Sequence, residues 1–354
     1  MKMVIKLIIA CVVCLVGILL IYIVGVLIYS LLSEFKPSQV EEITTEHVGL
    51  KQIKANQELK LLTWNIGYAG LGKEMDFFYE GGQKVRPDKD LSKSYLQGIS
   101  DVLVKQDSID FILLQEVDFD SKRSYNIDQS IEISTVLPKH NKISAINYLS
   151  KYVPVPYLNP MGKVKSGLLS YSKYKATEAN RLATPGKYSL PTRLFMLKRC
   201  LLISRYQVDN EKELVLINLH NSAFDDAEEL RKAELNFLKQ LIIEEYGKGN
   251  YVIAGGDWNQ NPPGLNMGKI EKYKTRSVWP IEKNYLPKDW NWAFDLSVPT
   301  NRDVHEPFNI HTTTCSILDY FVTSPNIELI ETKTIDKGFV YSDHQPVLVV
   351  IKLK

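Results

Sequence analysis

The chain has 354 residues, of which 45% are hydrophobic and 24% are charged. This composition is typical of a globular protein with a large apolar core, and it excludes a disordered chain. The formal net charge of +2 excludes a strong polycationic field that binds nucleic acid regardless of sequence, so nucleic acid is allowed as a partner but not indicated.

Residues 7–32 form an apolar run without a charge. As a helix rising about 1.5 Å per residue, the run exceeds the ~30 Å hydrocarbon core of a bilayer. It is too long for a cleaved signal peptide, and no cleavage site of small residues follows it, so we predict one transmembrane helix. Lys2 and Lys6 precede the run, and the positive-inside rule then places residues 1–6 in the cytoplasm. We predict a single-pass protein of the cell membrane whose large domain is extracellular.

Residues 33–57 are polar, contain Pro37 and lack a sustained period, so we interpret them as a linker to a domain at 58–354. The domain opens with a predicted strand at 59–64. This strand ends at Asn65, and the carboxyl ends of strands are where open sheets usually build their sites.

Residues 68–94 are rich in glycine and charge and show no strand period. A loop of this length inside a compact domain is usually functional or disordered. Its Lys73, Lys84 and Arg86 either hold an anionic substrate or belong to a solvated surface. Apolar residues then recur at helical spacing over 95–106, which predicts an amphipathic helix on one face of a sheet.

Two more predicted strands end in polar residues. The apolar segment 110–114 is followed by Glu116, and residues 199–208 and 213–219 form a predicted hairpin whose second arm ends at His220. A carboxylate and an imidazole therefore join Asn65 at strand ends.

Other features of this region leave alternatives open. Residues 140–152 have weak helical character, and residues 165–171 resemble a strand. Arg199 either binds phosphate or is a solvated charge at the edge of the hairpin. Cys200 and Cys315 are either an extracellular disulfide or two buried thiols, because the sequence does not show whether they lie close together.

A predicted helix at 225–246 leads into an apolar strand at 251–254. Two glycines follow the strand, and glycine lets the backbone turn tightly. Alternation along extended chain points Asp257 and Asn259 the same way. A carboxylate and a carboxamide that converge in this way suit an activated water and an anionic oxygen, although a polar loop closed by Asn-Pro-Pro-Gly is the alternative.

The segment 265–307 is irregular and carries Trp279, Trp290 and Trp292. Tryptophans in a loop either pin the loop onto its own domain, which we favour, or stack on a base or contact a lipid.

The last two predicted strands, 316–323 and 345–353, also carry polar landmarks. Asp319 lies on the first, and Asp343 and His344 directly precede the second. Strands, hairpins and helices alternate along the domain, which predicts sheets with helices outside them.

In this order, the polar segments resemble the endonuclease/exonuclease/phosphatase superfamily, in particular its deoxyribonuclease and sphingomyelinase branches, which share the N-x-H segment. The resemblance implies an α+β fold, a four-layer α/β/β/α sandwich, here with an N-terminal transmembrane helix. The matching segments are TWNIG at 63–67, LLQEVD at 113–118, NLH at 218–220, GGDWN at 255–259, LDYF at 318–321 and SDHQP at 342–346.

The resemblance implies a divalent cation held by Asn65 and Glu116, with Asp343 close to the metal or its waters. Carboxylate and amide oxygens suit Mg²⁺ or Mn²⁺ better than zinc. The cation would neutralise the phosphate and stabilise the leaving oxygen.

The same resemblance assigns the catalytic groups. Asp257 would orient or deprotonate the attacking water, and Asn259 would hold the phosphate. His344 would contact the phosphate or act as a base, with Asp319 fixing its tautomer. His220 would be a general acid or a phosphate ligand. Which group is the formal base stays open.

We therefore expect a membrane-tethered, Mg²⁺-dependent phosphoesterase that cleaves a phosphodiester or phosphomonoester. An extracellular nuclease is the first expectation, and a lipid or head-group phosphodiesterase is the alternative. A non-catalytic binding module of the same fold is the third. The two long loops match no branch signature, so the substrate stays open, and no obligate protein partner is evident.

Overall fold

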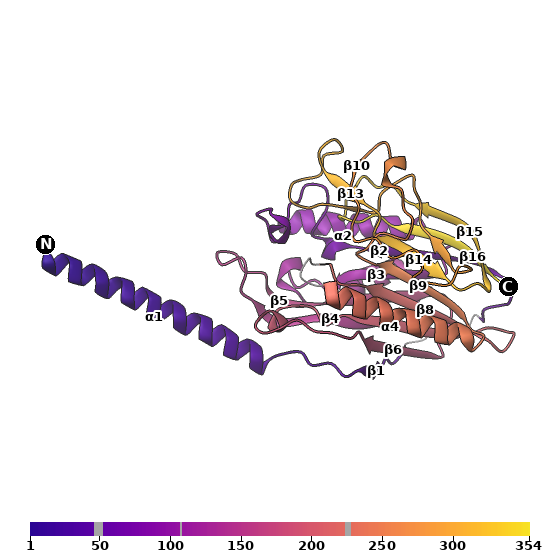
Figure 1. The fold of residues 1–354 in the computed structure, drawn as a ribbon, viewed down its shortest axis with the longest axis horizontal. Coiled ribbons are helices and arrows are strands. Elements are labelled where there is room, and N and C mark those ends of the chain that lie inside the picture. The colour runs from indigo at the N-terminus through magenta and orange to yellow at the C-terminus, as the bar shows by residue number, and fades with distance from the viewer. Residues whose placement is uncertain (46–51, 107, 224–227) are drawn as a thin grey trace.

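The computed structural model of the chain describes residues 1–45, 52–106, 108–223 and 228–354. Helix α1 (Lys2–Leu32) is apolar and long enough to cross a membrane, and its apolar side chains are exposed. It projects from one end of the domain (Figure 1).

The segment expected to be a linker contributes to the domain. Residues 46–51 lie outside the described residues, but Val40–Glu42 forms strand β1, which pairs antiparallel with β6 (Glu178–Ala183). Ile53 is fully buried in the central core. Parts of the chain between α1 and residue 58 are therefore built into the domain, Val40–Glu42 at the sheet edge and Ile53 in the core.

Two large sheets and one small sheet form the domain. The seven-stranded sheet has the order β1, β6, β7 (Cys200–Gln207), β8 (Glu213–His220), β9 (Tyr251–Asp257), β14 (Asp319–Thr323) and β11 (Asn291–Ala293). The six-stranded sheet has the order β15 (Ile327–Thr334), β16 (Val347–Leu353), β2 (Glu58–Asn65), β3 (Phe111–Asp118), β5 (Gly162–Ser172) and β4 (Asn141–Val153). The small sheet has the order β10 (Lys274–Thr275), β13 (Thr314–Ser316) and β12 (Asn301–Arg302).

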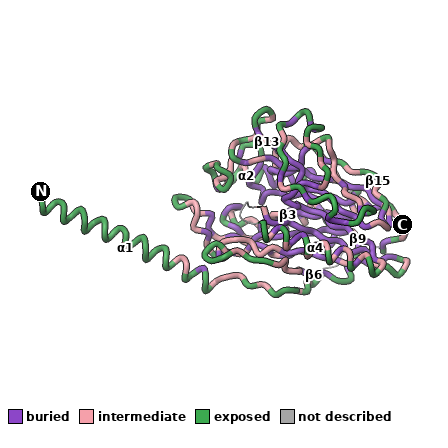
Figure 2. Tube along the Cα trace, in the orientation of Figure 1, coloured by how far each residue is buried: buried purple, intermediate pink, exposed green. Residues whose placement is uncertain are grey.

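The two large sheets pack face to face, and helices cover their outer faces. Leu61 and Leu113 of one sheet share a buried cluster with Leu216 and Ile253 of the other. Helix α4 (Glu228–Gly247) packs on the outside of the seven-stranded sheet, and helices α2 (Lys89–Val104) and α3 (Gln129–Val136) pack on the outside of the six-stranded sheet. Figure 2 shows the buried strands running between exposed outer surfaces. The predicted four-layer sandwich is confirmed.

Strand register brings the polar strand ends to one edge of the sandwich. Parallel pairing of β8 with β9 places His220 opposite Asp257, and antiparallel pairing of β14 with β9 places Asp319 opposite the same residue. Parallel pairing of β2 with β3 brings Asn65 level with Gln115. Residues far apart in the sequence thus meet because neighbouring strands end together.

Several local predictions differ from the structure. Residues 140–152 are not helical, because most of β4 alternates buried and less buried positions with the period of a strand. Helix α2 begins at Lys89 rather than at residue 95, because Asp88 caps it by accepting a hydrogen bond from the Leu91 amide. The first residues of the helix predicted at 225–246 lie outside the described residues.

The two glycines before Asp257 do not form the expected turn. Gly255 and Gly256 lie inside β9, opposite Asn218 and Leu219 of β8. A β-carbon on Gly256 would lie 2.0 Å from the Leu219 carbonyl oxygen, so glycine is required for close strand packing rather than for a turn.

Candidate active site

A cleft of about 620 Å³ opens at the edge where the strands end. Six of the eight residues predicted for the site line it. These are Glu116, His220, Asp257, Asn259, Asp343 and His344. The other two, Asn65 and Asp319, are buried behind them and hydrogen-bond to Asp257 and His344, respectively.

Asp257 is the centre of the polar network. Its Oδ2 accepts a hydrogen bond from Asn65 Nδ2 at 3.0 Å, and its Oδ1 accepts one from the Asn259 amide at 2.9 Å. The Nε2 atoms of His220 and His344 lie 3.4 and 3.7 Å from Oδ2. Burial raises the pKa of Asp257 to about 6, against the opposing charge of His344. A carboxylate with this pKa is suited to accept a proton near neutral pH.

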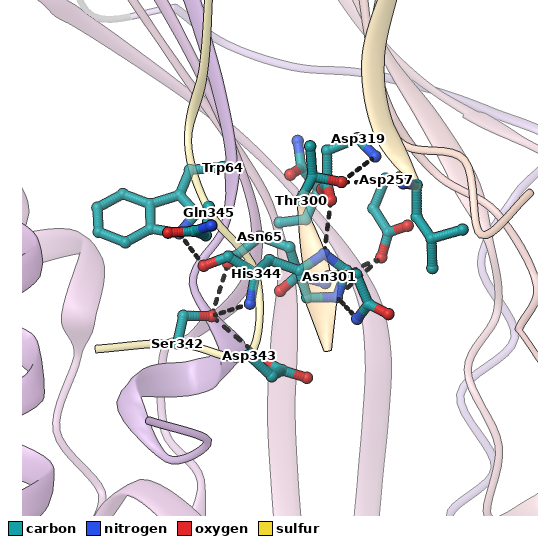
Figure 3. A network of polar contacts seen from close by, with 12 residues as sticks. Trp64, Asn65, Asp257, Thr300, Asn301, Asp319, Ser342, Asp343, His344 and Gln345 are labelled. Atoms are coloured by element: carbon teal, nitrogen blue, oxygen red, sulfur yellow. Dashed lines mark hydrogen bonds and ion pairs between the residues drawn. The ribbon is translucent and has the colours of Figure 1, made fainter. Parts of the chain in front are cut away.

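His344 lies just before β16 of the six-stranded sheet and is held by a carboxylate on β14 of the seven-stranded sheet (Figure 3). Its Nδ1 lies 2.7 Å from Asp319 Oδ2, and its Nε2 lies 3.1 Å from Asn301 Nδ2 and faces Asp257. Burial opposes protonation, but the charges of Asp319 and Asp257 outweigh it and raise the pKa of His344 well above its ordinary value. Thr300 fixes this end of β14 by accepting hydrogen bonds from the amides of residues 318 and 319 through its hydroxyl oxygen. His344 is therefore oriented by Asp319, and the carboxylates around it favour its protonated form.

His220 has the opposite protonation preference. Burial and the nearby Arg199 guanidinium lower the pKa of His220 well below its ordinary value. Its Nε2 faces Asp257 and lies 4.0 Å from Glu116 Oε1, and its buried Nδ1 has no hydrogen-bond partner among the described residues. The two histidines thus differ in charge within one cleft.

Glu116 and Asp343 form a second acidic group beside Asp257. Glu116 has a left-handed backbone, with φ of 54°, at a register shift in the pairing of β3 with β5. Such strain in a non-glycine residue is typical of functional sites. Asn65 Nδ2 donates to Glu116 Oε1 at 3.2 Å, and Ser342 Oγ donates to Asp343 Oδ1 at 3.2 Å. Burial raises the pKa of Asp343 to about 7, and the charge of Glu116 adds to the increase.

The residues present fit a hard divalent cation. Glu116 and Asp343 bring two carboxylates toward one side of the cleft. Asn65 turns its amide nitrogen toward Glu116, and its oxygen accepts from the Gly67 amide at 3.0 Å, so Asn65 would have to turn its amide to offer that oxygen to a cation. Oxygen ligands of this kind suit Mg²⁺ or Mn²⁺. Asp257, Asp319 and His344 also offer ligand atoms within 4.8 Å of one another. However, the Nδ1 of His344 is already paired with Asp319, so these three fit a carboxylate–imidazole couple better than a cation site.

The cleft contains residues for which the sequence carried little signal. Arg123 lies over the Tyr68 ring at 3.7 Å and forms an ion pair with Asp118 at 3.0 Å. Arg199, for which two roles were expected, lines the cleft and has one buried guanidinium nitrogen without a partner among the described residues. Asn301 reaches His344 across 43 residues of sequence. These contacts depend on long-range packing, so no local pattern marks them.

Other expected residues lie elsewhere. Lys73, Lys84 and Arg86 are not among the residues that line the cleft, while Trp279 is one of them, with the Arg231 guanidinium 3.8 Å from its ring. Trp290 and Trp292 pack in the cluster outside the seven-stranded sheet. Cys200 and Cys315 are free and buried, so the disulfide alternative is wrong.

A sandwich with acidic, amide and histidine side chains at one edge is the arrangement expected of the endonuclease/exonuclease/phosphatase superfamily. The sequence profile of the Endonuclease/Exonuclease/phosphatase family matches residues 62–344, and the chain belongs to this family. A search of curated protein sequences finds no significant match.

Solved structures share the fold at low sequence identity. An endonuclease/exonuclease/phosphatase from Beutenbergia cavernae DSM 12333 is 17% identical, with a TM-score of 0.52, over 84% of this chain and 72% of that chain. The human nocturnin catalytic domain with bound sulfate is 17% identical, with a TM-score of 0.52, over 85% of this chain and 97% of that chain. D. rerio TDP2 complexed with single strand DNA product is 13% identical, with a TM-score of 0.53, over 83% and 99%.

Proposed function

We propose that this protein hydrolyses a phosphoester with the help of a divalent cation. The proposal rests on the groups that surround Asp257 Oδ2 in the cleft. This oxygen faces Asn65, His220 and His344. A water held against this oxygen is placed for attack in line with the leaving group. The new bond joins the water oxygen to phosphorus, the bond from phosphorus to the leaving oxygen breaks, and a proton passes to the leaving oxygen.

The neighbouring side chains have separate roles in this proposal. Asp257 orients the water and takes its proton, which the raised pKa of about 6 favours. His344, held by Asp319, donates to a phosphate oxygen as an imidazolium. Asn259 and neutral His220 bind the phosphate from the other side of Asp257, where Asn259 Nδ2 lies 3.3 Å from Oδ2.

Asn65, Glu116 and Asp343 are the residues that would hold Mg²⁺ or Mn²⁺. When bound, the cation neutralises phosphate charge and stabilises the leaving oxygen. Without it, the like charges of Glu116 and Asp343 are poorly compensated, as the raised pKa of Asp343 indicates.

We also propose that α1 anchors the protein as a single-pass membrane protein, with residues 1–6 in the cytoplasm and the domain at 58–354 outside the cell. The length and apolar surface of α1 support the anchor, and the lysines before it support the orientation. A reporter fused after Lys354 should be accessible from outside intact cells. A reporter accessible only from the cytoplasm would overturn this orientation.

Two substrate classes fit this chemistry. Resemblance to the deoxyribonuclease branch supports nucleic acid, and an enzyme of this kind should be sensitive to salt and indifferent to the anchor. The membrane anchor supports a lipid head group as the alternative. The complete set of polar residues in the cleft argues against a non-catalytic binding module.

The experiment uses the full-length chain in detergent micelles and bis(para-nitrophenyl) phosphate as a generic phosphodiester. Turnover should require Mg²⁺ or Mn²⁺, stop with EDTA, and fall by about a thousandfold or more in Asp257→Ala. Asp101→Ala, which removes an exposed carboxylate on α2, is the matched control and should keep full turnover. Full activity of Asp257→Ala would refute the proposed role of Asp257.

A second measurement separates an enzyme with an untested substrate from a binding module. Mg²⁺ affinity, measured by titration calorimetry, should be lost in Glu116→Ala and kept in Asp101→Ala. Absence of Mg²⁺ binding by the unmodified chain would refute the metal-dependent mechanism.

A further inference from the structure

The anchor helix does not end in a free tether but is docked on the domain. Glu34, directly after α1, has a side chain that is only 4% exposed. It pairs with Arg193 Nε at 2.9 Å and Lys198 Nζ at 3.3 Å. A buried carboxylate held by two cations fixes its own chain segment. The orientation of the domain relative to α1 is therefore set by specific contacts.

A second contact lies within the apolar helix itself. The Tyr22 hydroxyl is 3.1 Å from the Tyr152 hydroxyl at the end of β4. A bilayer core takes about 20 helical residues, so a span that begins at Leu7, directly after the charged Lys6, ends near Val26, about one helical turn beyond Tyr22. Tyrosine is also enriched where membranes meet water. Tyr152 of the domain therefore lies at the level of the membrane interface.

The structural elements that touch the anchor are also walls of the cleft. Tyr148 of β4 and Met161, next to the start of β5, line the cleft a short distance from the Tyr152 contact. Leu197 and Arg199 line it on either side of Lys198, which Glu34 holds. Because the anchor segment contacts both walls of the cleft, the domain cannot rotate the cleft far away from the membrane while these contacts persist.

Strand register places the turn between β4 and β5 at the same edge. β5 pairs antiparallel with β3, so its first residues lie beside the carboxyl end of β3, where Asp118 faces Ser166. Within this turn, Tyr157 is 83% exposed and Leu158 is 102% exposed. Two adjacent, fully exposed apolar side chains are unusual in contact with water alone. At the membrane interface, the same side chains would enter the head-group region.

The arginines Arg123, Arg199, Arg276 and Arg302 line the cleft and suit the phosphate of either substrate class. Beside these polar groups, apolar side chains line the walls and would suit the glycerol and upper acyl carbons of a lipid. They are Leu71, Phe77, Tyr79, Met161, Met196 and Leu197.

We propose that the docked anchor and the turn at 154–161 seat the mouth of the cleft on the outer membrane surface, and that the substrate is the phosphodiester of a lipid head group in the same bilayer. The inference rests on the proposed phosphoesterase function. It favours lipid over the nucleic acid expected first from the sequence. A nucleic acid would have to enter between the cleft and the membrane surface.

The first test compares two esters with the same scissile bond, hexadecyl para-nitrophenyl phosphate in the bilayer and methyl para-nitrophenyl phosphate in solution. The full-length chain is reconstituted in vesicles of phosphatidylcholine and phosphatidylglycerol with Mg²⁺. In each ester, water attacks phosphorus and para-nitrophenolate leaves. The variant Tyr157→Ser with Leu158→Ser should lower turnover of the hexadecyl ester by about tenfold or more, the factor expected for losing one buried apolar side chain.

Turnover of the methyl ester should not change in this variant, because neither residue lines the cleft. An equal effect on both esters, or no effect on either, would overturn the membrane-surface placement. Preference of the unmodified chain for single-stranded DNA over the hexadecyl ester would also overturn it and would support a nuclease. Failure to hydrolyse any ester or DNA would instead contradict the proposed function.

A measurement independent of catalysis tests the placement itself. Tryptophan fluorescence of Tyr157→Trp in vesicles with brominated lipids should be quenched beyond the level of the unmodified chain. Ile330→Trp is the matched control, because Ile330 is exposed on β15 and β15 lies on the far side of the domain from α1 (Figure 1). Equal quenching of the two variants would overturn the proposal whatever the activity.

Discussion

Replacing Asp343 with asparagine should stabilise the metal-free protein and abolish metal binding. Asp343 is 6% exposed, and its charged form is opposed by burial and by Glu116. Asparagine keeps the side-chain oxygen that accepts from Ser342 Oγ, but it carries no charge. The substitution therefore removes the cost of a buried charge while it keeps the shape and the hydrogen bond.

The pKa of Asp343 gives the size and the direction of this effect. Its pKa rises from 3.8 to about 7 in the folded protein, and at about 1.4 kcal/mol for each tenfold change the charged carboxylate costs about 4 kcal/mol. A raised folded-state pKa means that the stability from this group is fully present below pH 3.8 and is lost as the pH rises through about 7. At about pH 8, Asp343→Asn should therefore raise the melting temperature by roughly 5–10 °C.

The assay is thermal unfolding of the full-length chain in detergent, followed by near-ultraviolet circular dichroism in EDTA at about pH 8 and about pH 5. The stabilisation should be full at the higher pH and less than half as large at the lower one, because the lower pH lies only about one unit above the unfolded-state pKa of 3.8. Mg²⁺ should raise the melting temperature of the unmodified chain but not of Asp343→Asn, and Asp101→Asn should behave like the unmodified chain. A lower melting temperature of Asp343→Asn in EDTA at about pH 8 would refute the reasoning.

Three further predictions concern the Asp319–His344 couple, the ion pair of Glu245 with Arg205, and the backbone at Gly256. In Asp319→Asn, the pKa of His344 should fall because the nearest negative charge is lost. The alkaline limb of the pH profile of kcat/KM should therefore move to lower pH. An alkaline limb that does not move would contradict the proposed role of protonated His344. Glu245→Gln removes a buried carboxylate that binds Arg205 at 2.8 Å, and it should lower the free energy of unfolding by about 1–3 kcal/mol. Because this pair lies outside the cleft, kcat/KM should not change, and a specific loss of turnover would contradict that separation. Gly256→Ala should fail to fold, because its φ is 147° and the added carbon meets a backbone carbonyl; a normal yield of protease-resistant protein would contradict the packing argument.

The sequence predicted the main strands and their polar ends because both signals are local. A short apolar run followed by a polar residue marks a strand end wherever the strand lies, as at Asn65, Glu116 and Asp257. Pairing of β2 with β3, and packing of their sheet against the sheet that holds β9, then brings the three side chains together. Prediction was accurate where the chemistry of the site lies on the strands themselves.

The sequence did not predict features that depend on tertiary contacts. β4 looked weakly helical because its apolar residues are spaced ambiguously, and pairing with β5 decided the conformation. Asn301 and Arg123 lie in segments without a clear period, and only contacts with His344 and Tyr68, which are distant in the sequence, place them in the cleft. The docking of Glu34 on Arg193 is likewise invisible in sequence, because an acidic residue after an apolar helix normally indicates a solvated tether.

The spacing of the catalytic strands depends on the two glycines that precede Asp257. A β-carbon on Gly255 would lie 2.3 Å from an aromatic ring of β14, and one on Gly256 would lie 2.0 Å from a backbone carbonyl of β8. β14 carries Asp319 and β8 carries His220, so any displacement by a larger residue would move both away from Asp257. Because hydrogen bonds and ion pairs weaken steeply over fractions of an ångström, the glycines determine the distances on which the site depends.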